Sequence, residues 1–264
     1  MNTATPSVIV LDLDGTSARY EPRFELDPEV RKALAEARSH IPGLRWVLNS
    51  DRFEGEMIRL AEYLEPAERP DAILSCQHLM FLRRDDGYVA HETWNDRHRR
   101  LHARLWQNIY PRFHGWQERI RDEYPVHELF VCDRYFAFRV PPKRLPALRS
   151  HVRNILTPWP EAGISGNHEW VFVNHRDFSK GALLREYARL IGSDAAEILA
   201  IGDGYNDLSM LDRRVAAYLG CPGDAATDVC RAVKDAGGIV AQAPGPAGTA
   251  SIIRQFCQIA SVSP

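Results

Sequence analysis

The sequence SVIVLDLDGT, residues 7–16, joins a short apolar run to a pair of acidic side chains. The run at residues 7–11 is rich in β-branched residues and predicts a buried strand. Asp12 and Asp14 follow it, and ligands bind at the carboxyl ends of strands in an open parallel sheet. Two carboxylates this close repel each other unless a cation or a shared proton compensates. Oxygen ligands without a nearby histidine or cysteine favour Mg²⁺, although Asp14-Gly15 taken alone also suits an ordinary turn.

Segments with strand and helix patterns alternate towards both ends of the chain. Asp27-Pro28 is a typical helix start, and Gly192 is placed to stop a later helix. Short apolar runs separated by helical stripes predict a parallel α/β sheet. The predicted strands cover residues 7–11, 45–48, 72–75, 198–201, 215–219 and 238–241, and the predicted helices cover residues 28–41, 53–64 and 183–191, with a short one from residue 250.

The middle of the chain has a different character. Residues 82–173 hold 15 Lys and Arg against 11 Asp and Glu, a balance of +4, whereas the whole chain holds 33 against 35. We therefore expect an inserted α+β domain with an antiparallel sheet at 82–173, between core segments at 1–81 and 174–264. Its predicted elements are two helical faces within residues 94–124, a strand at 128–140, a helix at 145–156 and a strand at 170–173.

Length and composition exclude several classes of protein. A chain of 264 residues with 45% hydrophobic and 26% charged residues is ordinary for a globular protein. A net charge of −2 argues against a general nucleic-acid binder. No apolar run approaches the ~20 residues that span a bilayer, and the polar N-terminus is too short for a signal peptide. The five cysteines form no CxxC pair. We expect a cytoplasmic protein with reduced thiols that binds neither nucleic acid nor membranes.

Three further polar segments lie at predicted strand ends or helix starts. The Ser50 hydroxyl, after the strand at 45–48, suits a phosphate oxygen, although serine there is also a common helix cap. Lys180 opens a helix, where the dipole disfavours a cation, so it indicates a nearby anion or else an exposed surface lysine. Asp203 and Asp207 lie in GDGYND, after the strand at 198–201. Unless that segment is only a polar turn, four acids then surround one cation.

DLDGT, Ser50, Lys180 and GDGYND, in that order, resemble the four motifs of the haloacid dehalogenase-like superfamily. The insertion lies between the second and third motifs, where one branch of that superfamily carries a C2-type cap. The chain resembles Cof-type, sucrose-phosphatase and mannosylglycerate-phosphate phosphatase members, and also eukaryotic phosphomannomutases. The resemblance implies an α/β fold, a Rossmann-like parallel-sheet core with an inserted α+β cap domain.

The resemblance also implies roles for individual residues. Asp12 would be the nucleophile that forms an aspartyl phosphate, and Asp14 would be the general acid and base. Lys180 would pair with Asp12 and the phosphate. The implied phosphate-binding residues are Ser50, Asp51, Lys180 and Asn206. The implied Mg²⁺ site consists of Asp12, the Asp14 carbonyl and Asp203, with Asp207 at or close to the ion.

The second motif departs from the family pattern. Ser50-Asp51-Arg52 stands where the family often has Thr-Gly-Arg, so an acidic side chain replaces a glycine whose amide usually approaches phosphate. That side chain would repel phosphate unless it points away. Gln77-His78 stands where the family often has Asn-Gly.

The basic insertion suggests a substrate-binding role. Arg134 and Arg139, on a predicted strand, are the candidates for contact with an anionic or polyhydroxylated substrate, whereas the arginines at 97–104 suit the solvated face of a helix. The leading prediction is a Mg²⁺-dependent phosphatase of a small phosphorylated metabolite, and the resemblance implies a sugar phosphate. The alternatives are a phosphomutase of the phosphomannomutase type and a catalytically silent binding module on the same fold.

Overall fold

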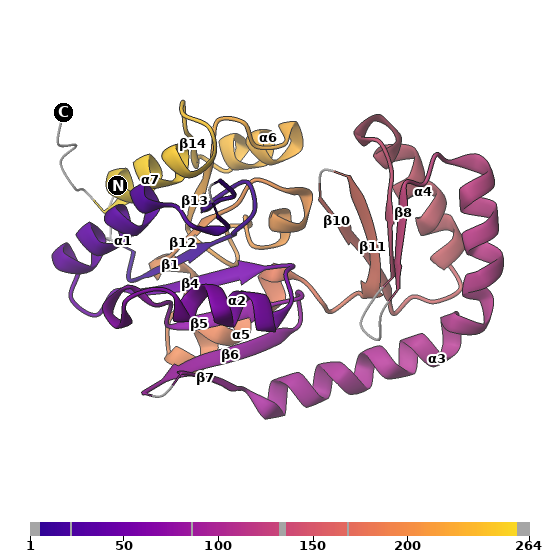
Figure 1. The fold of residues 1–264 in the computed structure, drawn as a ribbon, viewed down its shortest axis with the longest axis horizontal. Helices are drawn as coiled ribbons and strands as arrows, with labels where there is room; N and C mark the ends of the chain where they lie inside the picture. The colour runs from indigo at the N-terminus through magenta and orange to yellow at the C-terminus, as the bar shows by residue number, and fades with distance from the viewer. Residues whose placement is uncertain (1–5, 22, 86, 132–135, 168, 258–264) are drawn as a thin grey trace. The chain divides into compact units, whose positions relative to one another are not determined.

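A computed structural model describes residues 6–21, 23–85, 87–131, 136–167 and 169–257. The chain forms two units (Figure 1). The core unit comprises Met1–His91 and Lys180–Pro264, and the inserted unit is Glu92–Ser179. These limits differ from the predicted insertion at 82–173. The inserted unit begins later than predicted, because two antiparallel strands over residues 79–90 still belong to the core sheet.

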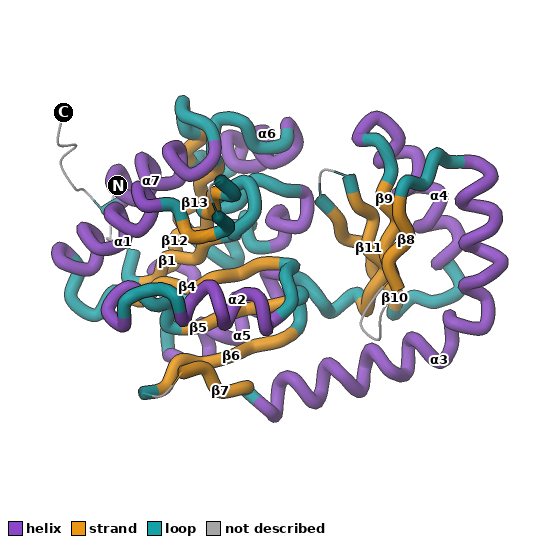
Figure 2. The backbone as a smooth tube through the Cα atoms, in the orientation of Figure 1, coloured by secondary structure: helices purple, strands orange, loops and turns teal. Residues whose placement is uncertain are grey.

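The core unit is built on one eight-stranded sheet (Figure 2). Neighbouring strands are parallel from β14 to β5, as the alternating pattern predicted, whereas β5, β6 and β7 run antiparallel to one another. The strands in spatial order are β14 (Ile239–Val240), β13 (Tyr218–Cys221), β12 (Ile198–Ile201), β1 (Val8–Leu11), β4 (Arg45–Ser50), β5 (Ala72–Ser75), β6 (Leu79–Arg84) and β7 (Gly87–Ala90).

Helices cover the core sheet because its central strands are apolar on both faces. Ile9 and Leu11 of β1 pack in one cluster with side chains of α1 (Pro28–His40), α2 (Glu54–Glu62) and α7 (Gly245–Phe256). The helix α5 (Lys180–Ile191) contacts β4, β5 and β6. Figure 1 shows α2 in front of the sheet and α5 behind it. The remaining core elements are α6 (Thr227–Asp235), the two-stranded β2 (Ala18–Arg19) and β3 (Glu25–Leu26), and the 3₁₀ helices η1 (Pro66–Glu68), η3 (Ala195–Glu197) and η4 (Tyr205–Ser209).

Helix boundaries follow the signals in the sequence. The Asp27 side chain accepts a hydrogen bond from the backbone N–H of Glu29, and Pro28 takes the first position of α1, as predicted. Gly192 follows α5 with φ 71°, a left-handed conformation that glycine adopts without steric cost. The helix that carries Lys180 therefore ends at a residue that the sequence marks.

The inserted unit packs two helices against a four-stranded antiparallel sheet. Its order is β10-β11-β9-β8. The single strand predicted at residues 128–140 is wrong: it forms two antiparallel strands, with Glu128 opposite Arg139, because its alternating pattern suits both arms of a hairpin. The elements are α3 (Glu92–Glu123), β8 (Glu128–Val131), β9 (Phe136–Arg139), η2 (Pro142–Arg144), α4 (Leu145–Leu156), β10 (Ala162–Gly166) and β11 (Trp170–His175).

The two predicted helical faces within residues 94–124 belong to one helix, α3, which contains Pro111. Its buried stripe includes Leu105, Ile109, Phe113 and Trp116, and it packs against residues of the sheet such as Phe136. The spacing of three or four residues keeps the stripe on one side over the length of the helix. No helix in the described ranges is both long and apolar enough to cross a bilayer.

Candidate active site

The first acidic motif forms a tight turn at the carboxyl end of β1. Asp12 is 5% exposed, and its backbone N–H donates to the carbonyl of Ile201, which extends the pairing of β1 with β12 (3.0 Å). Gly15 has φ 74°, and a Cβ at this position would collide with the carboxylate of Asp203. The turn therefore requires glycine both for its backbone conformation and for the approach of the fourth motif.

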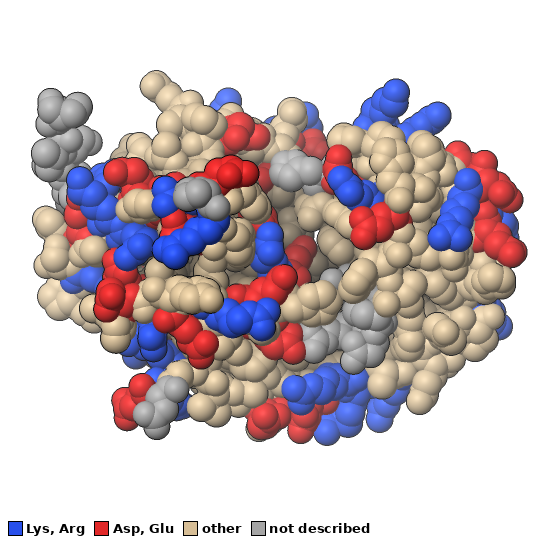
Figure 3. All heavy atoms as spheres, in the orientation of Figure 1, with Lys and Arg blue, Asp and Glu red and all other residues tan. Residues whose placement is uncertain are grey.

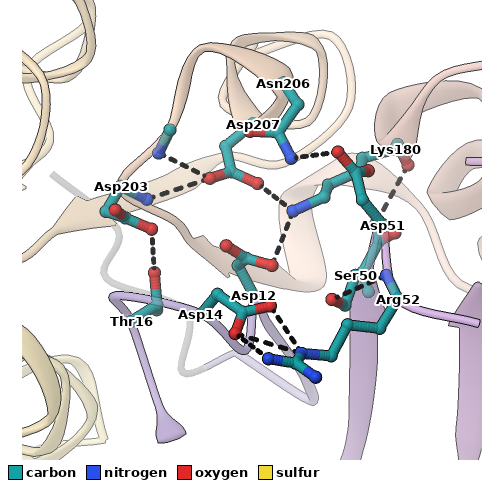
Figure 4. Close-up of polar contacts among 12 residues, drawn as sticks. Asp12, Asp14, Thr16, Ser50, Asp51, Arg52, Lys180, Asp203, Asn206 and Asp207 are labelled. Carbon is teal, nitrogen blue, oxygen red and sulfur yellow. Dashed lines mark hydrogen bonds and ion pairs between the residues drawn. The ribbon is translucent and has the colours of Figure 1, made fainter. Parts of the chain in front are cut away.

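Lys180, the first residue of α5, lies between two carboxylates (Figure 4). Its Nζ is 2.6 Å from Asp12 Oδ1 and 2.5 Å from Asp207 Oδ1, and the side chain is fully buried. Burial alone would lower the pKa of Lys180, but the charges of Asp12 and Asp207 outweigh it and raise the pKa above its ordinary value. The lysine stays charged, and the anions expected near it are these two carboxylates.

Three of the four predicted acids form a compact cluster. Carboxylate oxygens of Asp12, Asp203 and Asp207 all lie within 4.8 Å of one another, and all three residues are buried. Both oxygens of Asp207 are engaged, one by Lys180 and the other by the backbone N–H groups of Asp203 (3.0 Å) and Gly204 (2.8 Å). Asp207 thus fixes the loop that presents Asp203. The described ranges contain no other group of three or more residues suited to hold a metal ion.

The charge of this cluster fits a divalent cation. Burial raises the pKa of Asp12 well above its ordinary value, and the neighbouring charge of Asp207 adds to this effect while Lys180 opposes it. Burial raises the pKa of Asp207 to about 6, again against Lys180. Three carboxylates with one ammonium leave excess negative charge, and a donor set made only of oxygens suits Mg²⁺.

The second motif lies beside this cluster at the end of β4. Ser50 is buried, and its Oγ accepts a hydrogen bond from the backbone N–H of Arg52 (3.3 Å). Asp51 Oδ2 accepts from Asn206 Nδ2 at 2.8 Å, so two of the residues assigned to phosphate by resemblance bond to each other. Burial raises the pKa of Asp51, whereas Lys180 and Asn206 lower it. Asp51, the acid that stands in place of the family's glycine, is thus hydrogen-bonded to Asn206 of the fourth motif.

Backbone strain follows the strand β5, at two residues of which the second, Gln77, is the first of the pair that stands where the family often has Asn-Gly. Cys76 and Gln77 have φ values of 52° and 63°, in the left-handed region that non-glycine residues rarely adopt. Such residues cost roughly 1–3 kcal/mol each and persist where the surrounding structure holds them. Burial raises the pKa of Asp51, and a hydrogen bond from Gln77 opposes this effect. The hydrogen bond connects this strained turn to the second motif.

Asp14 pairs with Arg52, a residue for which the sequence predicted no role. Arg52 Nε lies 2.8 Å from Asp14 Oδ2, and Arg52 Nη2 lies 2.8 Å from Oδ1 (Figure 4). The Tyr20 hydroxyl also donates to Oδ1. Burial would lower the pKa of Arg52, but Asp14 raises it. The buried Thr16 is a second addition, since its hydroxyl donates to Asp203 Oδ1 at 2.8 Å. Thr16 stood within the quoted DLDGT motif, whereas no sequence signal marked Tyr20.

The two predicted substrate residues belong to the inserted unit. Arg139 pairs with Glu169 (2.7 Å) and Glu128 (3.7 Å). These two carboxylates raise the pKa of its guanidinium. Arg134 lies outside the described residues. Figure 3 shows basic side chains, interspersed with acidic ones, over the first half of α3, and Arg97, Arg99, Arg100 and Arg104 are all exposed there. That run is a solvated helix face.

Comparison with known proteins relates the chain to one family. The family model for haloacid dehalogenase-like hydrolases matches residues 75–218, more than half of the chain. A phosphoglycolate phosphatase of Aeropyrum pernix is 51% identical over 65 residues, which are 25% of this chain and 25% of that protein. The chain therefore matches about a quarter of the length of this curated relative.

Solved structures share the fold across nearly the whole chain. A sucrose-phosphatase from Synechocystis sp., in complex with sucrose and phosphate, has a TM-score of 0.68 at 14% identity and covers 96% of this chain and 98% of its own. A haloacid dehalogenase-like hydrolase from Bacteroides thetaiotaomicron has a TM-score of 0.63 at 19% identity, with 94% and 98% covered. A subclass IIB sugar phosphatase has a TM-score of 0.62 at 17% identity, also with 94% and 98% covered.

Proposed function

Because the chain belongs to the haloacid dehalogenase-like hydrolases, we propose that it is a Mg²⁺-dependent phosphatase of a small phosphomonoester. One observation carries the proposal. Asp12 directly follows β1 and contacts the buried Lys180, and its carboxylate lies within 4.8 Å of those of Asp203 and Asp207. A nucleophilic carboxylate, a fixed ammonium group and a cluster of oxygen ligands are the parts that phosphoryl transfer needs. The intact set argues against a catalytically silent binding module.

In the first half-reaction Asp12 attacks the phosphorus of the substrate. A bond forms between a carboxylate oxygen of Asp12 and phosphorus while the bond from phosphorus to the ester oxygen breaks. Asp14 gives its proton to the departing oxygen, which leaves as an alcohol. The ammonium of Lys180 and the hydroxyl of Ser50 stabilise the charge on the transferring phosphoryl group. The product on the protein is an aspartyl phosphate.

In the second half-reaction water releases the phosphate. Asp14, now a carboxylate, takes a proton from the water as its oxygen attacks phosphorus. The bond from phosphorus to Asp12 breaks, inorganic phosphate leaves, and both aspartates return to their starting states. Asp12, the Asp14 carbonyl and Asp203, with Asp207 close by, would hold Mg²⁺, which would supply charge neutralisation for the carboxylates and the phosphoryl oxygens.

Asp51 and Asn206 would act together in phosphate binding. Their side chains already bond to each other at 2.8 Å, so the amide of Asn206 is oriented before substrate arrives. The acid at position 51 thereby orients a donor instead of presenting its own charge to phosphate. The substrate roles of Arg134 and Arg139 stay predictions.

A sugar phosphate is the first candidate substrate, because two proteins of the same fold are a sucrose-phosphatase and a sugar phosphatase. The 65-residue match to a phosphoglycolate phosphatase favours a second candidate, a small phosphorylated hydroxy acid. Both are phosphomonoesters that the same chemistry cleaves.

The test is a phosphate-release screen over hexose phosphates, sucrose 6-phosphate and 2-phosphoglycolate, with MgCl₂ and after chelation with EDTA. We expect steady phosphate release from at least one small monoester, with loss of activity in EDTA and recovery on addition of Mg²⁺. A protein that releases no phosphate from any of these substrates with Mg²⁺, or that works fully after chelation, would overturn the proposal.

A further inference from the structure

Both carboxylate oxygens of Asp14 accept hydrogen bonds. Arg52 approaches with two nitrogens, each 2.8 Å from a different oxygen, and Tyr20 adds its hydroxyl to Oδ1. The Asp14 side chain is 41% exposed, so packing alone would leave it free to rotate. A guanidinium group that makes two parallel hydrogen bonds to a carboxylate fixes the orientation of that carboxylate as well as balancing its charge, because the two bonds define its plane. We call this bidentate pair the fork.

Arg52 is itself held on several sides. Its guanidinium carbon lies 4.0 Å from the ring centroid of Phe24, and Nη1 lies 3.5 Å from Glu56. Its backbone carbonyl accepts a hydrogen bond from Ser75 Oγ at 2.6 Å. The rings of Phe24 and Tyr20 lie 5.6 Å apart, so one segment after β1 supplies both the stacking face and the hydroxyl. The arginine therefore has little freedom of its own to pass on to Asp14.

We propose that Arg52 is a positioning residue, held by Phe24, that fixes the Asp14 carboxylate for proton transfer. The inference rests on the proposed function, because it takes Asp14 as the acid and base of that reaction. Proton transfer needs a hydrogen-bonded approach to the reacting oxygen, and a misplacement of about 1 Å can cost about 100-fold in rate. The role of Arg52 is thus carried out through Asp14 and requires no contact with the substrate.

Two other roles of Arg52 make different predictions. An ordinary exposed ion pair contributes about 0–1 kcal/mol to stability and would leave catalysis unchanged. An arginine that binds the phosphoryl group directly would affect every phosphate ester alike. A positioning role affects a substrate according to how much its leaving group needs a proton. The leaving group is therefore the experimental variable.

The experiment compares Arg52→Gln with wild type on 4-nitrophenyl phosphate and on the best alkyl phosphate of the screen. The aryl leaving group departs without protonation, so its kcat/KM should change less than about 3-fold. The kcat/KM of the alkyl phosphate should fall by about 10–100-fold, within the range that general acid catalysis contributes. Because Asp14 also activates water, the variant should show a burst of 4-nitrophenol followed by slow turnover.

Conservative variants follow the same logic. Arg52→Lys keeps the charge but loses the fork, so it should recover only part of the alkyl-phosphate activity. Phe24→Leu and Tyr20→Phe should show the same leaving-group pattern with smaller losses. In the double variant Arg52→Gln with Asp14→Asn, the loss should be no larger than that of Asp14→Asn, since Arg52 acts through Asp14.

Arg31→Gln is the matched control. Arg31 also pairs with a carboxylate, Glu68, through Nη2 at 2.6 Å, and its side chain is 31% exposed against 29% for Arg52. It should leave both substrates unchanged. Equal losses of kcat/KM on both substrates in Arg52→Gln, faster turnover of the alkyl phosphate, or losses that add to those of Asp14→Asn would each overturn the inference. A wild type inactive on every substrate would instead overturn the proposed function, and the inference with it.

Discussion

Lys180 Nζ lies 2.6 Å from Asp12 Oδ1, although 168 positions separate the two residues in the chain. The contact joins the first residue of α5 to the residue that follows β1, and both side chains are buried. It also depends on Asp207, the second carboxylate on the same ammonium group. The stability of this part of the core is therefore tied to the balance of charge that the proposed chemistry uses.

Replacing Lys180 should destabilise the metal-free protein. Lys180→Met leaves Asp12 and Asp207 buried without a cation, and removing one partner of a buried pair costs about 3–5 kcal/mol. The free energy of unfolding, measured by denaturant titration in EDTA, should fall by that amount. The exposed Lys234→Met should stay within about 0.5 kcal/mol of wild type. Equal stabilities of the two variants would contradict this account of Lys180.

Replacing the nucleophile should abolish turnover and keep the fold. Asp12→Asn preserves the volume of the side chain but removes its charge, so phosphate release should fall by at least about 1,000-fold. The circular dichroism spectrum should remain that of wild type. Substantial activity in a preparation free of wild-type protein would remove Asp12 from this role.

The turn after β1 offers a comparison of two glycines. Gly15 and Gly43 have similar left-handed φ values, 74° and 78°, but a Cβ collides with Asp203 only at Gly15, whereas nothing lies within 4 Å at Gly43. Gly43→Ala should lose about 1 kcal/mol for its backbone conformation alone. Gly15→Ala should lose more and should also raise the Mg²⁺ concentration needed for half-maximal activity. The same Mg²⁺ requirement in both variants would show that Asp203 gives way freely.

Stabilisation by Mg²⁺ should depend on pH with a definite sign. Burial raises the folded-state pKa of Asp207 from its ordinary value of 3.8 to about 6, and it raises the pKa of Asp12 too. The metal-free fold therefore binds protons more tightly than the unfolded chain and loses stability as pH rises from about 4 through about 6. Mg²⁺ competes with those protons, so its effect on Tm should be small at pH 5 and larger at pH 7.5.

This prediction is checked by thermal denaturation in MgCl₂ and in EDTA at each pH. Asp207→Asn removes one titrating group and should flatten the fall of metal-free stability between pH 4 and pH 6. A Tm difference between MgCl₂ and EDTA that is the same at pH 5 and pH 7.5 would contradict the assignment of the buried acids.

Phosphatase and phosphomutase differ in the fate of the phosphoryl group. A mutase must shield its phosphoenzyme from water until it returns the group to sugar, whereas a phosphatase admits water. We expect phosphate release from mannose 6-phosphate, or a similar monoester, without a sugar bisphosphate as activator. Phosphate and positional isomers are followed together, with and without mannose 1,6-bisphosphate. Isomerisation much faster than phosphate release, and only with the bisphosphate, would favour the mutase.

The parts of the site that the sequence predicts lie at strand ends. Asp12, Ser50 and Asp203 each follow an apolar run, and parallel strands bring their carboxyl ends to one edge of the sheet. Residues 79–90 were not assigned to the core sheet, because an apolar run does not tell whether its strand pairs parallel or antiparallel. The fork between Arg52 and Asp14 was missed for a related reason. It joins two loops, and no periodicity relates the positions of loop residues.

The core unit resumes at Lys180 itself, directly after the last residue of the inserted unit, Ser179. Only residues 176–179 connect β11 to α5, and Lys180 is the first residue of that helix, which limits how the chain can be recombined. A crossover placed one residue inside α5 exchanges the lysine together with the foreign domain, and one residue added within its first turn rotates the rest of the helix by about 100°. The entry has no such constraint, since it follows the edge strand β7. Domain grafting in this protein should therefore tolerate variation at the upstream splice and demand residue-level accuracy at the downstream one.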